Sequence, residues 1–131
     1  MSVFVDTSAL FVLLDRDNAA HPRAADAFRD LLRADQLITH NYVVLETTAL
    51  VGRRLGLEGV RILLRDLVPN LEVVWIDEAT HAAAVSALLA SSARDVSLVD
   101  RVSFQVMRER DVASAFAFDS DFVNEGFETV P

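Results

Sequence analysis

Short apolar runs alternate along this chain with longer segments in which apolar residues recur at helical spacing. The short runs are rich in β-branched residues and bounded by polar ones, which is typical of buried strands. They predict strands at 2–5, 36–39, 71–76, 111–118 and 127–130. The helical spacing predicts helices over 9–14, 21–32, 42–55, 60–67, 79–90 and 97–110.

Strands and helices therefore follow one another in alternation, which favours an α/β fold. We expect a central, mostly parallel sheet of four to five strands with helices on both faces. The length of 131 residues is that of one ordinary domain, and no repeat or linker divides it, so residues 1–131 are expected to form a single domain. Asn41 stands where it could cap the helix over 42–55.

Composition narrows the class of protein. Hydrophobic residues make up 52% of the chain, enough for a substantial core. Charged residues interrupt every apolar run before it reaches the length of a membrane span, and the first residues do not read as a signal peptide. The absence of cysteine excludes disulfides, thiol catalysis and Cys-ligated zinc, and it is consistent with the cytoplasm as the expected compartment.

The charge balance is acidic and unusual in kind. Twenty acidic residues stand against 12 basic ones, for a net charge of −8, and every basic residue is arginine. Mechanisms that need a Schiff-base lysine or a phosphate-binding Walker lysine are thereby excluded. An acidic chain also has little non-specific affinity for nucleic acid, so a nucleic-acid substrate would depend on bound metal ions and local arginines.

Acidic residues occur where buried segments end or begin. Asp6 follows the first predicted strand directly, and Asp119 and Asp121 follow the fourth. Glu46 interrupts the apolar stretch that starts the third helix, and Asp100 lies in the first turn of the last long helix. Sites in open α/β sheets form at the carboxyl ends of strands, so these side chains are expected to converge on one edge.

Carboxylates at the edge of a core are costly unless a cation compensates them. Little positive charge lies near them in the sequence, so a divalent cation is the natural candidate. Carboxylate-bound Mg²⁺ or Mn²⁺ typically serves phosphate chemistry, and such a group can hold one ion or two. We expect the mutual repulsion of the carboxylates to destabilise the metal-free protein, and added metal to raise its melting temperature.

Each acid also has a purely structural interpretation. Asp6 could cap a helix. Asp100, three residues after Ser97, matches a capping box. Asp119 to Asp121 could be a polar turn, and Glu46, whose helical neighbours are apolar, could form a buried ion pair. The joint occurrence of all of them in one α/β chain is what favours a functional site.

Four short motifs in order resemble those of the PIN-domain ribonucleases. They are Val-Asp-Thr-Ser-Ala-Leu at 5–10, Asn-Tyr-Val-Val-Leu-Glu at 41–46, Ser-Leu-Val-Asp at 97–100, and Phe-Asp-Ser-Asp-Phe at 118–122 followed by Gly126-Phe127. Together they cover the chain from end to end. Size and motif spacing most resemble the VapC-type toxins of toxin–antitoxin pairs. The absence of lysine departs from expectation and leaves substrate contacts to arginine, histidine and backbone amides.

The resemblance implies roles for individual residues. The catalytic acids carried over are Asp6, Glu46, Asp100 and Asp119. The metal ligands carried over are Asp6, Asp100 and Asp119, with Asp121 as an accessory. The hydroxyl groups of Thr7 and Ser97 would position carboxylates or metal-bound water. The cofactor would be Mg²⁺ or Mn²⁺, and the reaction would be endonucleolytic hydrolysis of RNA.

The resemblance also implies partners: a second copy in a homodimer, and a cognate antitoxin that covers the active-site groove. The helical hairpin from Tyr42 to Leu67 is the candidate interface, although ordinary core packing would explain it equally well. A stand-alone RNA-processing nuclease and an inactive PIN-like scaffold remain as alternatives. A phosphorylated receiver domain would need a lysine after a late strand, and the chain has none.

Overall fold

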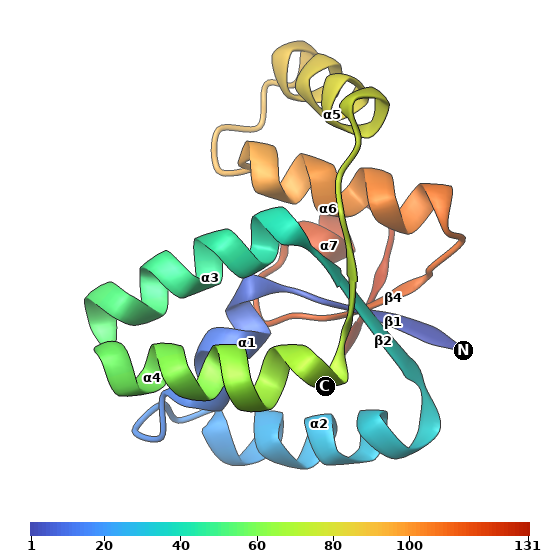
Figure 1. Ribbon diagram of the computed structural model, residues 1–131. Helices are drawn as coiled ribbons and strands as arrows, with labels where there is room; N and C mark the ends of the chain where they lie inside the picture. The colour runs from blue at the N-terminus through green and yellow to red at the C-terminus, as the bar shows by residue number, and fades with distance from the viewer.

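The computed structural model describes residues 1–131 and contains one five-stranded sheet (Figure 1). All four strand pairings are parallel, and the order across the sheet is β3-β2-β1-β4-β5. The strands are β1 (Ser2–Val5), β2 (Gln36–His40), β3 (Glu72–Val74), β4 (Ser114–Phe116) and β5 (Glu128–Val130). The predicted α/β class, parallel pairing and strand number are therefore confirmed.

Helices connect the strands in the predicted alternation. They are α1 (Thr7–Leu14), α2 (His21–Ala34), α3 (Asn41–Arg54), α4 (Leu57–Ile62), the π-helical turn η1 (Leu63–Leu67), the 3₁₀ turn η2 (Val68–Asn70), α5 (Glu78–Ala90), α6 (Leu98–Glu109) and α7 (Asp121–Asn124). No helix has the length and apolar character that crossing a membrane would require.

Helices cover both faces of the sheet, as predicted. On one face the ring of Phe28, from α2, stacks on Phe116 of β4 with 6.3 Å between centroids. On the other face Phe4 of β1 lies 5.9 Å from Phe122, whose ring meets that of Phe104 in α6 at 5.2 Å. Successive strand residues point to opposite faces, so the apolar runs supply both halves of the core.

The register brings the carboxyl ends of the central strands to one edge. Phe4 pairs with Ile38 of β2, and Val5 pairs with Phe116 of β4. The amide of Asp6 donates to the carbonyl of Phe116 at 3.0 Å, which continues this pairing one residue past the strand. Residues that follow β1 and β4 are therefore neighbours, as the site prediction required.

The cap of α3 differs from the prediction. His40, not Asn41, is the N-cap, because its Nδ1 accepts the amide hydrogen of Val43 at 3.3 Å. Asn41 is the first helical residue, and its Oδ1 accepts the amide hydrogen of Ile76 at 2.8 Å. The Asn41 side chain thus binds the segment that follows β3 instead of capping its own helix. Local sequence signals do not reveal such a contact between distant segments.

The second arm of the predicted hairpin begins earlier than expected, at Leu57, and its last turn widens into a π-helix. Gly56 ends the turn between the arms with φ at 87°, a conformation that side chains disfavour. Gly59 packs so closely on α3 that an added Cβ would stand 2.9 Å from Val51. The hairpin is therefore partly core, yet Leu45 and Leu57 stay exposed.

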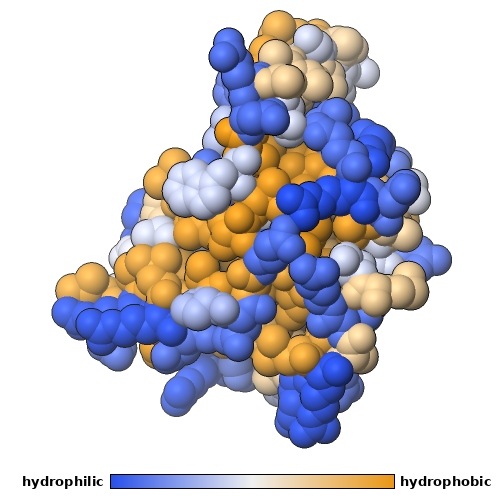
Figure 2. Space-filling model, turned by 45° about the vertical axis from the view of Figure 1, so that its right-hand side comes forward, coloured by the Kyte–Doolittle hydropathy of each residue, from blue (hydrophilic) through white to orange (hydrophobic).

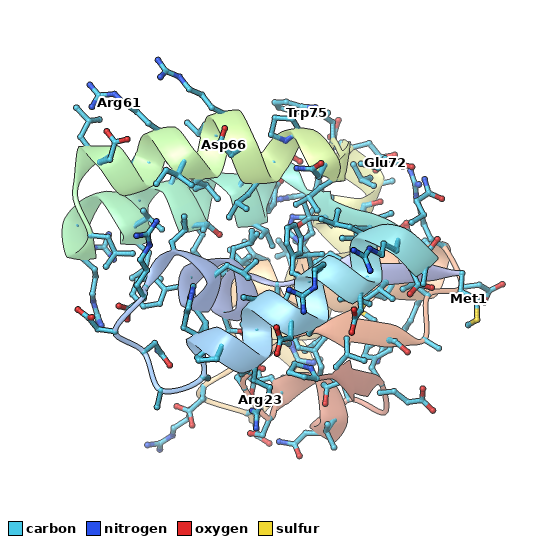
Figure 3. All side chains as sticks on the ribbon, turned by 90° about the horizontal axis from the view of Figure 1, so that it is seen from below. Met1, Arg23, Arg61, Asp66, Glu72 and Trp75 are labelled. Atoms are coloured by element: carbon cyan, nitrogen blue, oxygen red, sulfur yellow. The ribbon has the colours of Figure 1, made fainter.

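Apolar surface extends from this hairpin to the sheet. Figure 2 shows apolar side chains gathered in the middle of one face with charged side chains around them. A groove of about 450 Å³ opens between α3, η2 and the edge strand β3, and it is lined by Asn41, Val44, Leu45, Thr48, Val68, Val73 and Trp75. Trp75 is 78% exposed and stands at the molecular surface (Figure 3).

Candidate active site

Asp6 lies at the centre of the candidate site, between the end of β1 and the start of α1. Only 2% of its surface is exposed. Its Oδ2 accepts the amide hydrogen of Ser8 at 3.1 Å and the hydroxyl hydrogen of Ser8 at 2.7 Å. Burial raises the pKa of Asp6 to about 7; the bonds from Ser8 oppose this rise, and the charges of Asp119 and Asp100 add to it.

Asp100 is held by the capping box that the sequence suggested as a structural alternative. Its Oδ2 accepts the amide hydrogen of Ser97 at 3.0 Å, and the Ser97 hydroxyl accepts the amide hydrogen of Asp100 at 3.1 Å. Burial raises the pKa of Asp100, the bonds from Ser97 lower it, and the charge of Asp119 raises it further. The cap therefore fixes the carboxylate at the site rather than removing it from the site.

Asp119 and Asp121 form the polar turn after β4. Oδ1 of Asp119 accepts the amide hydrogen of Asp121 at 3.1 Å. Burial raises the pKa of Asp121, and the charges of Asp119 and Asp100 raise it further. Four aspartates from three separate segments of the chain therefore repel one another across the carboxyl edge of the sheet.

The free carboxylate oxygens show how this group could receive a cation. Asp6, Asp100 and Asp119 each use one oxygen in a local hydrogen bond to a backbone amide, and the other oxygen bonds no protein group. The second oxygen of Asp6 reaches solvent, because the only buried unpaired side-chain nitrogen or oxygen in the molecule is Arg101 Nε. These are hard anionic donors of the kind that Mg²⁺ and Mn²⁺ prefer.

The residues fit such a cation by chemistry and charge. The raised pKa values mark carboxylates that the protein itself does not neutralise. In this structure, however, no three acidic or histidine side chains stand in the mutual positions of a formed metal centre.

Glu46 and Thr7 stand differently from the aspartates. Glu46 is half-buried in α3 and forms no ion pair and no hydrogen bond, so the predicted alternative of a buried ion pair is wrong. Its charge is not among the main causes of the shifted pKa values of Asp6, Asp100 and Asp121. The Thr7 hydroxyl accepts from Thr47 at 3.1 Å and so joins α1 to α3 beside Glu46. The catalytic role of Glu46 and the positioning roles of the Thr7 and Ser97 hydroxyls stay predictions.

Ser8 was not assigned in the sequence, yet it links two parts of the site. Its hydroxyl donates to Asp6 and accepts the amide hydrogen of Phe118, the residue before Asp119, at 3.0 Å. One hydroxyl group thus joins the end of β1 to the segment after β4. The local signal was present, because a serine two residues after an N-cap aspartate is placed to return a hydrogen bond.

Arg101 is the second residue that sequence reasoning missed. Its side chain is 10% exposed, and it donates to Glu125 at 3.0 Å and to Ser91 at 2.7 Å. Its charge opposes the rise in the pKa of Asp100, and it adds to the bond from Arg108 in lowering the pKa of Glu125. Arg101 therefore supplies the partial counter-charge of the acidic site, and it ties the start of α6 to the end of α5 and to the residue after α7.

His40 is buried and uncharged. The Ser103 hydroxyl donates to the carbonyl of Val99 at 3.0 Å, so Nε2 of His40 must donate to Ser103 across their 2.8 Å contact. Nδ1 then accepts from Val43, and a proton there would face another N–H group. Burial lowers the pKa of His40 to about 3. His40 is a structural cap and does not approach a substrate.

We expect Ser8→Ala to weaken both the fold and the site. The Phe118 amide would lose its acceptor and Asp6 one of its two donors, which corresponds to a loss of about 1–2 kcal/mol in the free energy of unfolding. Chemical denaturation at pH 7 measures this loss. Ser8→Thr keeps the hydroxyl and should retain most of the stability. If the alanine variant is as stable as the wild type, the two hydrogen bonds do not connect these segments in solution.

The fold and the clustered aspartates define the class of protein. Residues 3–127 match the PIN domain family, and the chain belongs to that family. The parallel α/β sheet and the aspartates at its carboxyl edge are consistent with this family assignment.

One relative, matched both in sequence and in structure, narrows the assignment within this family. The chain is 33% identical, over 98% of its length and 97% of the relative's, to the 23S rRNA-specific endonuclease VapC20 of Mycobacterium tuberculosis. Its structure also matches the crystal structure of VapC20, described as a toxin that cleaves the sarcin–ricin loop. The TM-score is 0.87 at 31% identity, covering 98% of this chain and 99% of that one. The predicted resemblance to VapC-type PIN domains is confirmed.

Proposed function

We propose that this protein is a VapC-type endoribonuclease that hydrolyses RNA phosphodiester bonds with the help of Mg²⁺ or Mn²⁺. The observation that carries the proposal is the group of four aspartates whose charges reach one another at the carboxyl edge of the sheet. Similarity to VapC20 over nearly the whole chain supports an RNA substrate.

The protein's own residues have separate tasks in this reaction. Asp6, Asp100 and Asp119 would hold the cation through their free oxygens, with Asp121 beside them and Glu46 approaching from α3. When bound, the cation neutralises charge on the phosphate and makes a water molecule a better nucleophile. Ser8 and Ser97 keep two of the carboxylates oriented, and Arg101 limits their mutual repulsion. The bond from phosphorus to one ribose oxygen breaks as the water oxygen adds.

The experiment is cleavage of purified ribosomal RNA, and of a hairpin RNA that carries the sarcin–ricin loop, with Mg²⁺ or Mn²⁺ and with a chelator. We expect cleavage that needs the metal and that falls by about a hundredfold or more in Asp100→Asn, because the metal contributes several kcal/mol to the transition state. The fragments should be mapped, since a VapC20-like specificity predicts a cut within the loop.

The matched control is Asp66→Asn. Asp66 lies in η1, in the second arm of the helical hairpin, and its exposed carboxylate takes part in no ion pair. This variant should cleave as the wild type does. Cleavage that persists in the chelator or in Asp100→Asn would contradict the metal-dependent mechanism. Loss of cleavage in both variants would point to net charge instead of the site.

Partners form a separate part of the proposal. A cognate antitoxin would find an apolar surface on the groove between α3, η2 and β3, where Leu45 and Trp75 are exposed. We also propose a homodimer and a cytoplasmic location, where RNA and an antitoxin would both be present. Light scattering tests the dimer directly, and a monomer at micromolar concentration would remove it. An antitoxin in a neighbouring gene would separate a toxin from a stand-alone processing nuclease.

A further inference from the structure

We propose that Arg23 binds an RNA phosphate beside the cleaved bond, held in place by the ring of Phe118. The inference rests on the proposed ribonuclease function and adds to it a substrate contact outside the acidic group. The central observation is the position of the Arg23 guanidinium, 5.5 Å from the centroid of the Phe118 ring.

The path of α2 places Arg23 at the edge of the sheet that carries the aspartates. The amide of Gln36 donates to the carbonyl of Met1 at 2.9 Å, so α2 ends at the opposite, amino edge. Phe28 in the middle of α2 stacks on Phe116, and Arg23, about one and a half turns earlier, lies over Phe118. Figure 1 shows α2 running along the sheet, and Figure 3 shows Arg23 away from Met1.

The backbone of Phe118, whose ring lies under Arg23, is linked to Asp6 through two hydrogen bonds of Ser8. The Phe118 amide donates to the Ser8 hydroxyl at 3.0 Å, and that hydroxyl donates to Asp6 at 2.7 Å. Asp119 is the next residue in the chain. The guanidinium therefore lies over the ring of the residue that precedes Asp119. The cation–π contact limits the side-chain freedom that a phosphate contact would otherwise have to remove.

The charge of Arg23 is available for a substrate. Five of the 12 arginines form ion pairs with acidic residues, and Arg23 is not one of them. The cation whose charge opposes the rise in the pKa values of Asp100 and Asp121 is Arg101. Arg23 thus lies over Phe118 without forming an ion pair with an acid, which suits a phosphate next along the RNA chain rather than the one being cleaved.

An acidic protein needs such a contact to hold RNA. With a net charge of −8 the chain repels the phosphate backbone at long range. Guanidinium groups bind phosphate through two parallel hydrogen bonds, and each neutralised phosphate of a single strand contributes about 0.7 to the slope of log affinity against log salt. Arg23 is expected to contribute one such contact.

The test compares Arg23→Gln with Arg33→Gln. Arg33 lies in the last turn of the same helix, also outside any ion pair, and roughly 15 Å further along the axis. In Arg23→Gln we expect KM for the hairpin RNA to rise about tenfold with kcat changed little, and the salt slope to fall by about 0.7. Arg33→Gln should match the wild type, and Arg23→Lys should recover the salt slope but not the full affinity.

Binding without cleavage keeps this test separate from the proposed function. Each arginine substitution is repeated in Asp100→Asn, and the affinity for fluorescent hairpin RNA is measured by anisotropy over a range of salt. Equal slopes for the Arg23 and Arg33 variants would overturn the Arg23 contact, even if the wild type cleaves RNA. A lower slope for Arg23→Gln supports the contact. A wild type that binds RNA but never cleaves it would overturn only the nuclease function.

Discussion

Asp6→Asn should abolish cleavage while making the metal-free protein more stable at neutral pH. Asp6 is buried and its pKa is raised to about 7, so its ionised form opposes folding. Asparagine keeps an oxygen that can accept from the Ser8 amide, but it carries no charge. We expect cleavage to fall about a thousandfold, because the metal loses a ligand. The free energy of unfolding should rise on the order of 2 kcal/mol at pH 8.

The pH dependence of this gain follows from the direction of the pKa shift. The folded-state pKa of Asp6 lies above the unfolded value of 3.8. The carboxyl group therefore favours folding fully below about pH 3.8, and this contribution is lost as the pH rises through about 7. Asp6→Asn should thus be more stable than the wild type at pH 8 and similar to it near pH 4. Thermal melts at both values, without metal, measure the difference.

Metal provides the control for this prediction. Mg²⁺ or Mn²⁺ at millimolar concentration should raise the melting temperature of the wild type and have much less effect on Asp6→Asn, because a ligand that binds only the folded state stabilises it. The two proteins should therefore approach each other in stability when metal is present. If Asp6→Asn is less stable than the wild type at pH 8 without metal, the burial of an ionised Asp6 is not what limits stability.

Arg101→Met should lower the stability of the protein more than Arg108→Met, the substitution of the other arginine that pairs with Glu125. The side chain is 10% exposed, and methionine can fill part of its volume but cannot bond Glu125 or Ser91. Removal of one partner from a buried ion pair typically costs about 3 kcal/mol in the free energy of unfolding, which corresponds to a fall of roughly 10 °C in melting temperature. Part of that loss is offset because the substitution also removes Arg101 Nε, a buried donor that has no acceptor.

Arg108→Met is the matched control, because Arg108 pairs with the same carboxylate at 2.8 Å but is 52% exposed. Its loss should cost less than about 1 kcal/mol. The pKa of Glu125 is lowered by the bond from Arg108 and by the charge of Arg101, so the pairing stabilises the fold above about pH 4.5 and is lost as the pH falls through the folded-state pKa. The difference between the two variants should therefore shrink in acid. Equal melting temperatures at pH 7 would contradict a buried role for Arg101.

Much of the fold could be predicted because the signals are local. The strands are short apolar runs, and a parallel sheet with both faces covered requires such runs. The helices carry their apolar residues at regular spacing, as in α6, where Val102, Val106 and their neighbours are buried. Boundaries were less certain, since a turn such as Gly56, or a cross-sheet contact such as that of Asn41, decides where a helix starts.

The candidate site was predictable in part for the same reason. Asp6 and Asp119 follow strands directly, and parallel strands deliver their ends to one edge, so their proximity needed no knowledge of the helices. Asp100 was expected at the same edge as well, but it lies on a helix, and the position of α6 over the sheet depends on packing. Glu46 was expected among the acids, yet its charge is not among the main causes of the shifted pKa values of Asp6, Asp100 and Asp121.

By itself, the sequence determined the fold class, the alternation of strands and helices with parallel strand pairing, and the acidic residues at the strand ends. These features follow from the periodicity of apolar residues and from the direction of the strands. Only the tertiary structure decided which groups surround those acids: Ser8 bonded to Phe118, Arg101 bonded to Glu125, and Arg23 over the Phe118 ring. These contacts join residues 24 or more positions apart, and each exists only because the helices pack in one arrangement on the sheet.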